Sequence, residues 1–324
     1  MIIARVLFLW ALVVIGLPAG NVFAQPYPSR SIRLIVPFTP GGISDLLARS
    51  LGTKLNPALG QQIVVENRPG AGTTIASEIV ARAAADGYTL YLQDITTHAI
   101  NASLYRRLPY DSLKDFTLVQ MLATTPLILV VHPSLPVRNV KELIAFAKAR
   151  PGQIIYGSSG NGTIVHLSTE LFKSMAGIDM VHVPFKGSPQ SVVALLSGEV
   201  AVSFPTMPPA LPNIQAGKLR ALAVTSPQRT KAAPDVPTVS EAGLKGYEMV
   251  LYSGILGPAN MPREIVTRLN GEIGKAIRAA ELKPILDKVG AEPVTMTPEQ
   301  FAAHLRSEIE KLGAIVRAVG ARID

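Results

Sequence analysis

Short apolar runs alternate with helical stripes along the first third of the chain. Residues 32–36 form an apolar run of strand length that ends in a Pro-Phe-Thr-Pro-Gly-Gly turn, and leucines then recur every four residues from Leu47 to Leu55. A run of this length is typical of a buried strand, and the four-residue spacing is typical of a helix face. The pattern predicts a strand–loop–helix unit, and the same order recurs at 63–80 and 88–97.

Three such units in succession predict an α/β protein with a parallel sheet, because parallel strands need a crossover between them. The second half of the chain repeats the pattern. Strands are predicted at 116–121, 127–131, 154–156, 180–184, 200–204 and 219–225, with a Pro-rich bend after 204, and helices from 139 to the Pro-Gly at 151–152, at 164–175 and at 192–196. Two helical stripes follow, and the second starts at a Thr-Pro-Glu-Gln capping box at 297–300. Two such sheets predict a cleft at the carboxyl ends of their strands, where open sheets bind ligands.

Composition excludes several classes of protein. The 324 residues carry a net charge of +8, but the lysines and arginines are scattered, so we expect no nucleic-acid partner. The chain has no cysteine, which excludes disulfides and a lipid-modified cysteine anchor. The five histidines are dispersed and the Gly-Ala-Gly at 70–72 lacks the third glycine of a dinucleotide loop, so we predict neither a metal nor a cofactor.

The N-terminus has the pattern of a secretion signal. Arg5 precedes an apolar core at 6–17, and Val22-Phe23-Ala24 suits cleavage after Ala24. The alternative is an uncleaved anchor, but the apolar run is shorter than the ~20 residues that a span needs. We therefore predict a signal peptide at 1–24 and a soluble exported protein.

Small polar residues collect in the loops that follow the predicted strands. Backbone amides at a helix start form an anion site, and hydroxyls can assist them. The candidate ligand-binding residues are Phe38, Thr39, Gly41, Gly42, Ser44, Asp45, Ala71, Gly72, Thr73, Thr96, Ser158, Ser159, Thr163 and His166.

We expect these residues to take different roles. Ser44 is predicted to cap its helix, and Phe38 to clamp the apolar part of a ligand. Asp45 either favours its helix start, orients the loop or meets a polar group of the ligand. Amides at 41–42 and 71–72 are predicted to hold one carboxylate, answered from the opposite sheet by hydroxyls of residues 158, 159 and 163.

Several blocks of the sequence together resemble the Bug-type extracytoplasmic receptors of tripartite tricarboxylate transporters, over nearly the whole mature chain. The similar blocks are Pro-Phe-Thr-Pro-Gly-Gly (37–42), Val-Glu-Asn-Arg-Pro-Gly-Ala-Gly (65–72), Asp-Gly-Tyr-Thr-Leu (86–90), Tyr-Gly-Ser-Ser-Gly (156–160), Val-Pro-Phe-Lys-Gly (183–187), Ala-Gly-Lys-Leu-Arg-Ala-Leu-Ala-Val (216–224) and Pro-Asp-Val-Pro-Thr-Val-Ser-Glu-Ala-Gly (234–243).

This resemblance implies a type II periplasmic-binding-protein fold, with two lobes built on central mixed, mostly parallel sheets and joined by two crossover strands. The first lobe is expected at 25–123 and 226–324, and the second at 124–225. The ligand implied is a small organic carboxylate and the partners are integral membrane transporter subunits; we expect a monomer in the periplasm. Departures from the family pattern fall at Thr73, Ala76, Phe185, Ala201 and Tyr252.

Two alternatives remain open. One is a periplasmic hydrolase or isomerase that uses Ser159 with His166. The other is a sensor partner that presents its ligand to a membrane kinase through the same pocket. We expect no enzymatic activity and predict a receptor.

Overall fold

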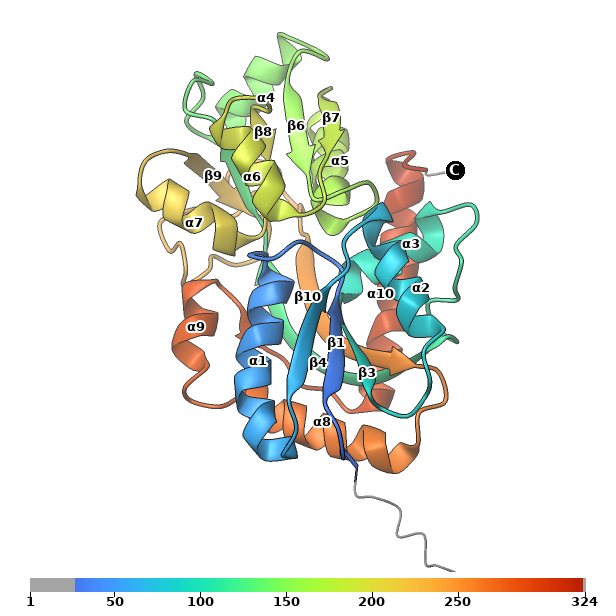
Figure 1. The fold of residues 1–324 in the computed structure, drawn as a ribbon. Coiled ribbons are helices and arrows are strands. Elements are labelled where there is room, and N and C mark those ends of the chain that lie inside the picture. The colour runs from blue at the N-terminus through green and yellow to red at the C-terminus, as the bar shows by residue number, and fades with distance from the viewer. Residues whose placement is uncertain (1–26, 323–324) are drawn as a thin grey trace, which may run out of the picture.

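The computed structural model describes residues 27–322, so the predicted signal peptide at 1–24 lies outside the described residues. Two lobes stand one above the other, each built on one β-sheet (Figure 1). No helix within residues 27–322 is long and apolar enough to cross a membrane.

The first sheet has the strand order β11-β4-β10-β3-β1-β2. Pairing of β1 with β2 and β3 is parallel, as the three strand–loop–helix units predict, whereas β10 runs antiparallel to β3 and β4. The strands are β1 (Ile32–Val36), β2 (Ile63–Asn67), β3 (Thr89–Asp94), β4 (Phe116–Pro126), β10 (Val250–Pro258) and β11 (Glu292–Pro293).

The second sheet has the order β7-β6-β8-β5-β9, in which β6 is parallel to β7 and β8, and β5 is antiparallel to β8 and β9. Both sheets are therefore mixed as expected, but they are not mostly parallel, because four of the strand pairings are parallel and five are antiparallel. The strands are β5 (Ile128–Val131), β6 (Ile155–Ser158), β7 (Val181–Pro184), β8 (Val202–Ser203) and β9 (Arg220–Val224).

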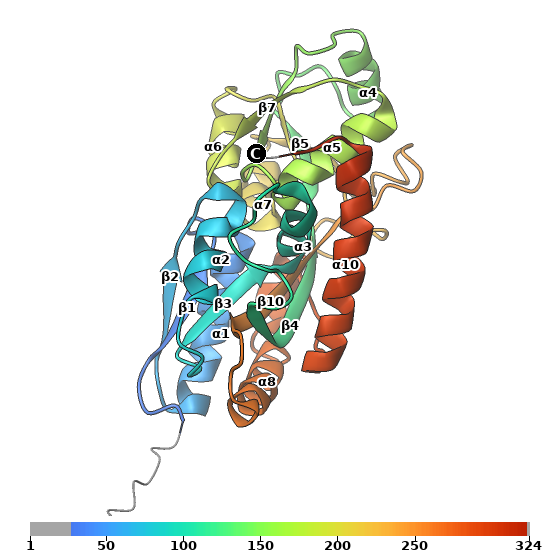
Figure 2. The same ribbon diagram turned by 90° about the vertical axis from the view of Figure 1, so that its right-hand side faces the viewer.

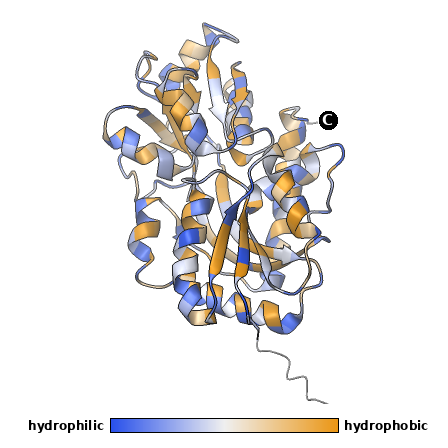
Figure 3. Cartoon of the chain, viewed as in Figure 1, coloured by the Kyte–Doolittle hydropathy of each residue, from blue (hydrophilic) through white to orange (hydrophobic). Residues whose placement is uncertain are grey.

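Helices cover both sheets, and Figure 2 shows α10 standing along α3 at the flank of the first sheet. Apolar strand residues such as Leu34 and Val130 are fully buried beneath them, and Figure 3 shows the apolar colouring concentrated on the strands. The helices are α1 (Ile43–Leu59), η2 (Ala71–Thr73), α2 (Thr74–Ala81), α3 (Ile95–Leu104), α4 (Val140–Lys148), α5 (Ile164–Ala176), α6 (Ser188–Leu196), α7 (Met207–Gln215), α8 (Arg263–Ile277), α9 (Lys283–Lys288) and α10 (Pro298–Ala318).

The chain crosses between the lobes at two neighbouring places. The first crossing runs from β4 through Leu127 into β5, and the second leaves β9 at Thr225 and returns at β10. The Leu127 amide donates to Thr225 Oγ1 at 2.8 Å, and the Thr225 amide donates to the Leu127 carbonyl at 3.0 Å. These bonds tie the two crossings together, so they can act as one hinge.

Three elements differ from the sequence prediction. The loop expected at 123–126 is part of the 11-residue strand β4. The Pro-rich bend is helix α7, because prolines at the first helical positions need no amide partner there. Strand β10 lies in the middle of the first sheet without a predicted counterpart, since two register shifts interrupt its pattern.

Candidate ligand-binding cleft

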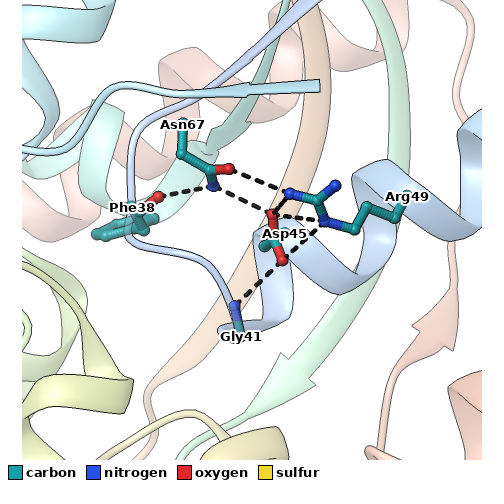
Figure 4. Close-up of polar contacts among 5 residues, drawn as sticks. All are labelled: Phe38, Gly41, Asp45, Arg49 and Asn67. Atoms are coloured by element: carbon teal, nitrogen blue, oxygen red, sulfur yellow. Dashed lines mark hydrogen bonds and ion pairs between the residues drawn. The ribbon is translucent and has the colours of Figure 1, made fainter. Parts of the chain in front are cut away.

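Asp45 holds the loop between β1 and α1 in place. Its carboxylate accepts from the Gly41 amide at 3.1 Å, from Arg49 Nε at 3.1 Å and from Asn67 Nδ2 at 3.1 Å (Figure 4). Asn67 Nδ2 also donates to the Phe38 carbonyl at 2.9 Å. Burial raises the pKa of Asp45, but the bonds from Arg49, Gly41 and Asn67 outweigh it and hold the pKa below the usual 3.8. Of the three roles left open by the sequence, the structure supports loop orientation.

One prediction for this loop is wrong. Gly42, not Ser44, is the N-cap of α1, and no side chain caps the helix. The Ser44 hydroxyl is buried without a partner among the described residues. The Gly41 amide donates to Asp45, and its role toward a ligand remains a prediction.

The second loop, η2, places its backbone against the opposite lobe. Ala71 and Thr73 have positive φ angles of 44° and 80°, which few non-glycine residues adopt. Thr73 Oγ1 accepts from Gln93 Nε2 at 3.1 Å, and the Ala71 carbonyl accepts from the Tyr105 hydroxyl at 2.9 Å. These contacts fix the strained turn from behind, so its front faces the cleft.

The third loop supplies Asp94, which the sequence reasoning did not select. Asp94 ends β3 and caps α3: its carboxylate accepts from the Thr97 amide at 3.0 Å and from the Thr97 hydroxyl at 2.5 Å. It is fully buried, and burial raises its pKa to about 6. Its position was available from the sequence, because it directly follows the strand of the third predicted unit.

Thr96 serves the sheet rather than the cleft. Its hydroxyl donates to the Val250 carbonyl and accepts from the Tyr252 amide, both at 3.0 Å. Thr96 lines neither of the two cavities described below. Its predicted ligand contact remains a prediction.

In the second lobe, the two serines after β6 have different partners. Ser158 Oγ lies 2.6 Å from His182 Nε2, whereas Ser159 Oγ donates to Thr163 Oγ1 at 2.9 Å. Thr163 is also the N-cap of α5. Of these three residues, Ser159 lines the cavities, whereas the ligand roles of Ser158 and Thr163 remain predictions.

His166 is engaged with His182 rather than with Ser159. The two imidazole rings stack with their centroids 4.1 Å apart, and the Gly162 amide donates to His166 Nδ1 at 3.3 Å. Burial lowers the pKa of His166, and burial lowers that of His182 to about 3. The arrangement expected for a Ser159–His166 hydrolase is therefore not formed.

Two cavities lie between the lobes. The inner cavity, of about 20 Å³, is lined from the first lobe by Phe38, Gly42, Ile43, Ser44, Asp94 and Leu251, and from the second by Ser159, Ile164, Val165, Ser188, Pro189 and Thr206. The outer pocket, of about 230 Å³, is lined by Pro37, Phe38, Gly70, Ala71, Gly72, Thr73, Ser159, Gly160, Asn161, Pro184, Phe185 and Lys186.

Phe38 and Ser159 line both spaces, so the two cavities are parts of one cleft. The predicted residues that the structure brings together there are Phe38, Gly42, Ser44, Ala71, Gly72, Thr73 and Ser159. The predicted residues outside these linings are Thr39, Gly41, Asp45, Thr96, Ser158, Thr163 and His166.

Direct hydrogen bonds join the lobes across the cleft. The Ile164 amide, at the start of α5, donates to Thr97 Oγ1 at 3.0 Å, and the Thr39 amide donates to the Lys186 carbonyl at 3.5 Å. The first bond extends the Thr97–Asp94 contact into the second lobe. The structure is therefore a closed arrangement of the two lobes.

Comparison with known proteins identifies the family. The family described as tripartite tricarboxylate transporter family receptor matches residues 47–321. The chain belongs to this family. BugT of Bordetella pertussis is 39% identical over 306 residues, which cover 94% of each chain.

Two solved structures are closely similar to this one. Rpa4515 of R. palustris, described with adipate, has a TM-score of 0.88 at 38% identity and covers 92% of this chain and 100% of its own. MatC from Rhodopseudomonas palustris, described with bound malate, has a TM-score of 0.84 at 30% identity, over 90% of this chain and 100% of its own. The expected binding-protein fold is thus confirmed.

Proposed function

We propose that this receptor captures a small carboxylate between its lobes and delivers it to the membrane subunits of a tripartite transporter. The observation that carries the proposal is that Gly42 and Ser159, from loops on opposite sheets, line the same cavity. The adipate and malate of the two similar receptors give the chemical class of ligand.

The outer pocket is the place we propose for the carboxylate. Lys186 is exposed and lines this pocket from the second lobe. The strained backbone at 71–73 lines the same pocket from the first lobe. A cation and oriented backbone groups both favour an anion. Phe38 and Phe185 supply apolar walls for the rest of the ligand.

Closure on the ligand is the proposed mechanism of capture. We assign the first lobe to 25–123 and 226–324 and the second to 124–225, with the tied crossings at Leu127 and Thr225 as the hinge. Contacts such as that between Ile164 and Thr97 span the two lobes, so a ligand that stabilises them shifts the population toward the closed state.

A receptor function accounts for the second-lobe contacts better than an enzymatic one. The Ser159 hydroxyl donates to Thr163, and His166 stacks on His182, so neither residue is arranged as a nucleophile and base. We propose a non-enzymatic receptor that is exported to the periplasm and whose signal peptide is cleaved after Ala24.

Native mass spectrometry of freshly purified protein tests this proposal by detecting a retained small acid, and calorimetry with that acid gives its affinity. A Cβ added at Gly42 would lie 3.8 Å from Pro189 Cδ, so the side chain of Gly42→Val narrows the inner cavity. This variant should bind the ligand more weakly without unfolding. Unchanged affinity would count against the site.

Conversion of the acid, lost in Ser159→Ala, would favour the hydrolase, and co-purification with a membrane kinase would favour the sensor.

A further inference from the structure

The inner cavity contains two buried hydroxyls without partners. Ser44 Oγ comes from α1 in the first lobe and Thr206 Oγ1 from the start of α7 in the second, and the two residues are 1% and 6% exposed. Neither oxygen has a hydrogen-bond partner among residues 27–322. A buried hydroxyl without a partner is costly, so each of the two groups is suited to a polar atom bound in this cavity.

Asp94 adds an acceptor to the same cavity. A carboxylate offers about four lone-pair positions. The Thr97 amide and hydroxyl and the Thr96 amide occupy three of those of Asp94, which leaves one for a ligand. No lysine, arginine or histidine of the described residues forms an ion pair with Asp94. Burial accordingly raises its pKa to about 6, which is the mark of a charge that its surroundings compensate only in part.

We propose, building on the carboxylate-receptor function above, that the ligand bears a hydrogen-bond donor at the end opposite its carboxylate, and that Asp94 selects this donor and disfavours a second carboxylate. The donor is an ammonium or a hydroxyl group. The ligand class is therefore amino acids or hydroxy acids with the donor at the far end, rather than simple dicarboxylates.

The sizes of the two spaces set the orientation of the ligand. The inner cavity of about 20 Å³ accommodates a group of the size of one water molecule, such as an ammonium or a hydroxyl. A carboxylate is larger, and beside Asp94 it would place two negative charges in one enclosed space. The outer pocket of about 230 Å³, with Lys186 in its lining, suits the carboxylate and the carbon chain.

Calorimetry at pH 7.5, above the pKa of Asp94, tests this selection. The probes are straight-chain acids of three to six carbons in four matched forms: unsubstituted, ω-amino, ω-hydroxy and dicarboxylic. At the best-fitting length, a donor-ended acid should bind about tenfold more tightly than both the unsubstituted acid and the dicarboxylate. The amino and hydroxy series distinguish the two sources of the donor.

Asp94→Asn retains a side chain that caps helices as well as aspartate does, so the fold should persist. It should remove the advantage of the donor-ended acids and bring the dicarboxylate to within about threefold of them. Asp94→Ser, a second capping residue, should act in the same way. Asp111→Asn, in an exposed turn where Asp111 accepts from the Leu113 amide, is the matched control and should leave the order unchanged.

Two results would overturn the inference: a dicarboxylate that binds the wild type at least as tightly as every donor-ended acid, or an order of affinities that Asp94→Asn leaves intact. In both cases acids bind, so the results would support the carboxylate-receptor function and refute only the selection by Asp94. If no acid of any series binds, the receptor function itself fails and this inference fails with it.

Discussion

The backbone of Gly72 in the first lobe packs directly against the Asn161 carbonyl in the second. A Cβ at Gly72 would lie 2.3 Å from that oxygen and 2.8 Å from the Tyr105 hydroxyl. No real Cβ tolerates such a contact with backbone, so this pair of residues requires glycine for the lobes to meet. The contact belongs to the closed arrangement, which makes it a direct test of closure.

We therefore expect Gly72→Ala to weaken ligand binding by about tenfold or more, because the lobes cannot close fully. Isothermal calorimetry measures the affinity. Gly217→Ala is the control: its φ of 69° resembles the 56° of Gly72, but nothing lies within 4 Å of its Cβ. Both variants should lose similar stability through backbone strain. Equal affinities in the two variants would refute a role for this contact in closure.

Thr97→Val should weaken binding by about 5- to 30-fold, because the closed state loses one interlobe hydrogen bond, the Ile164 amide is left unpaired and Asp94 loses the hydroxyl that donates to it. The affinity is measured by titration calorimetry. Thr267→Val, on the exposed face of α8, removes a hydroxyl that only donates to the Arg263 carbonyl and serves as the control. Wild-type affinity in Thr97→Val would show that this bond does not contribute to capture.

Asp45→Ala should lower the free energy of unfolding by about 1–3 kcal/mol, since the Gly41 amide and Asn67 lose their shared acceptor. Urea denaturation at neutral pH measures the loss. Because the folded-state pKa of Asp45 lies below 3.8, its contribution is present above that pH and is lost as the pH falls through the folded value. The difference in the free energy of unfolding between the wild type and Asp45→Ala should shrink over the same pH range.

A surface variant provides the comparison for Asp45. Asp287→Ala breaks an exposed pair with Lys283 on α9 and should change stability far less than Asp45→Ala, because exposed ion pairs contribute little. If Asp45→Ala costs no more than Asp287→Ala, the carboxylate of Asp45 does not hold the loop.

The wild-type protein should lose stability as the pH falls from 7 toward 4, and His182 should account for part of the loss. Its pKa is lowered from 6.5 to about 3 by burial, so the unfolded chain binds the proton first and acid favours unfolding. His182 is only partly buried, so we expect about 1–2 kcal/mol. Denaturation curves of wild type and His182→Gln at pH 7 and pH 5 measure it, and parallel pH profiles would contradict the assignment.

Thr297→Ala should cost about 1 kcal/mol by removing the cap of α10. Thr297 Oγ1 accepts from the Gln300 amide at 3.2 Å, and the Thr297 amide donates to Gln300 Oε1 at 2.9 Å. Thermal unfolding should show a lower midpoint than for Ser307→Ala on the exposed side of the same helix. Identical midpoints would mean that the capping box does not stabilise this end.

Local patterns sufficed for much of the fold. The apolar run before the Gly41-Gly42 turn and the leucine stripe after it specify β1 and α1, because both depend on neighbouring residues alone. The capping box at 297–300 was also predicted correctly. Strand β10 was not, since its place between β3 and β4 depends on pairing with residues more than 100 positions earlier.

The sequence by itself determined that loops rich in small polar residues follow the strands, and that those of β1 and β6 meet at one cleft, as Gly42 and Ser159 do. Only the tertiary structure decided which hydroxyls face it. Successive side chains of an extended segment point to opposite sides, so Ser158 faces His182 on β7 while Ser159 faces the gap. Asp94 likewise gains its place in the inner cavity only when α1, α5 and α7 assemble around it, because burial is a property of the whole fold.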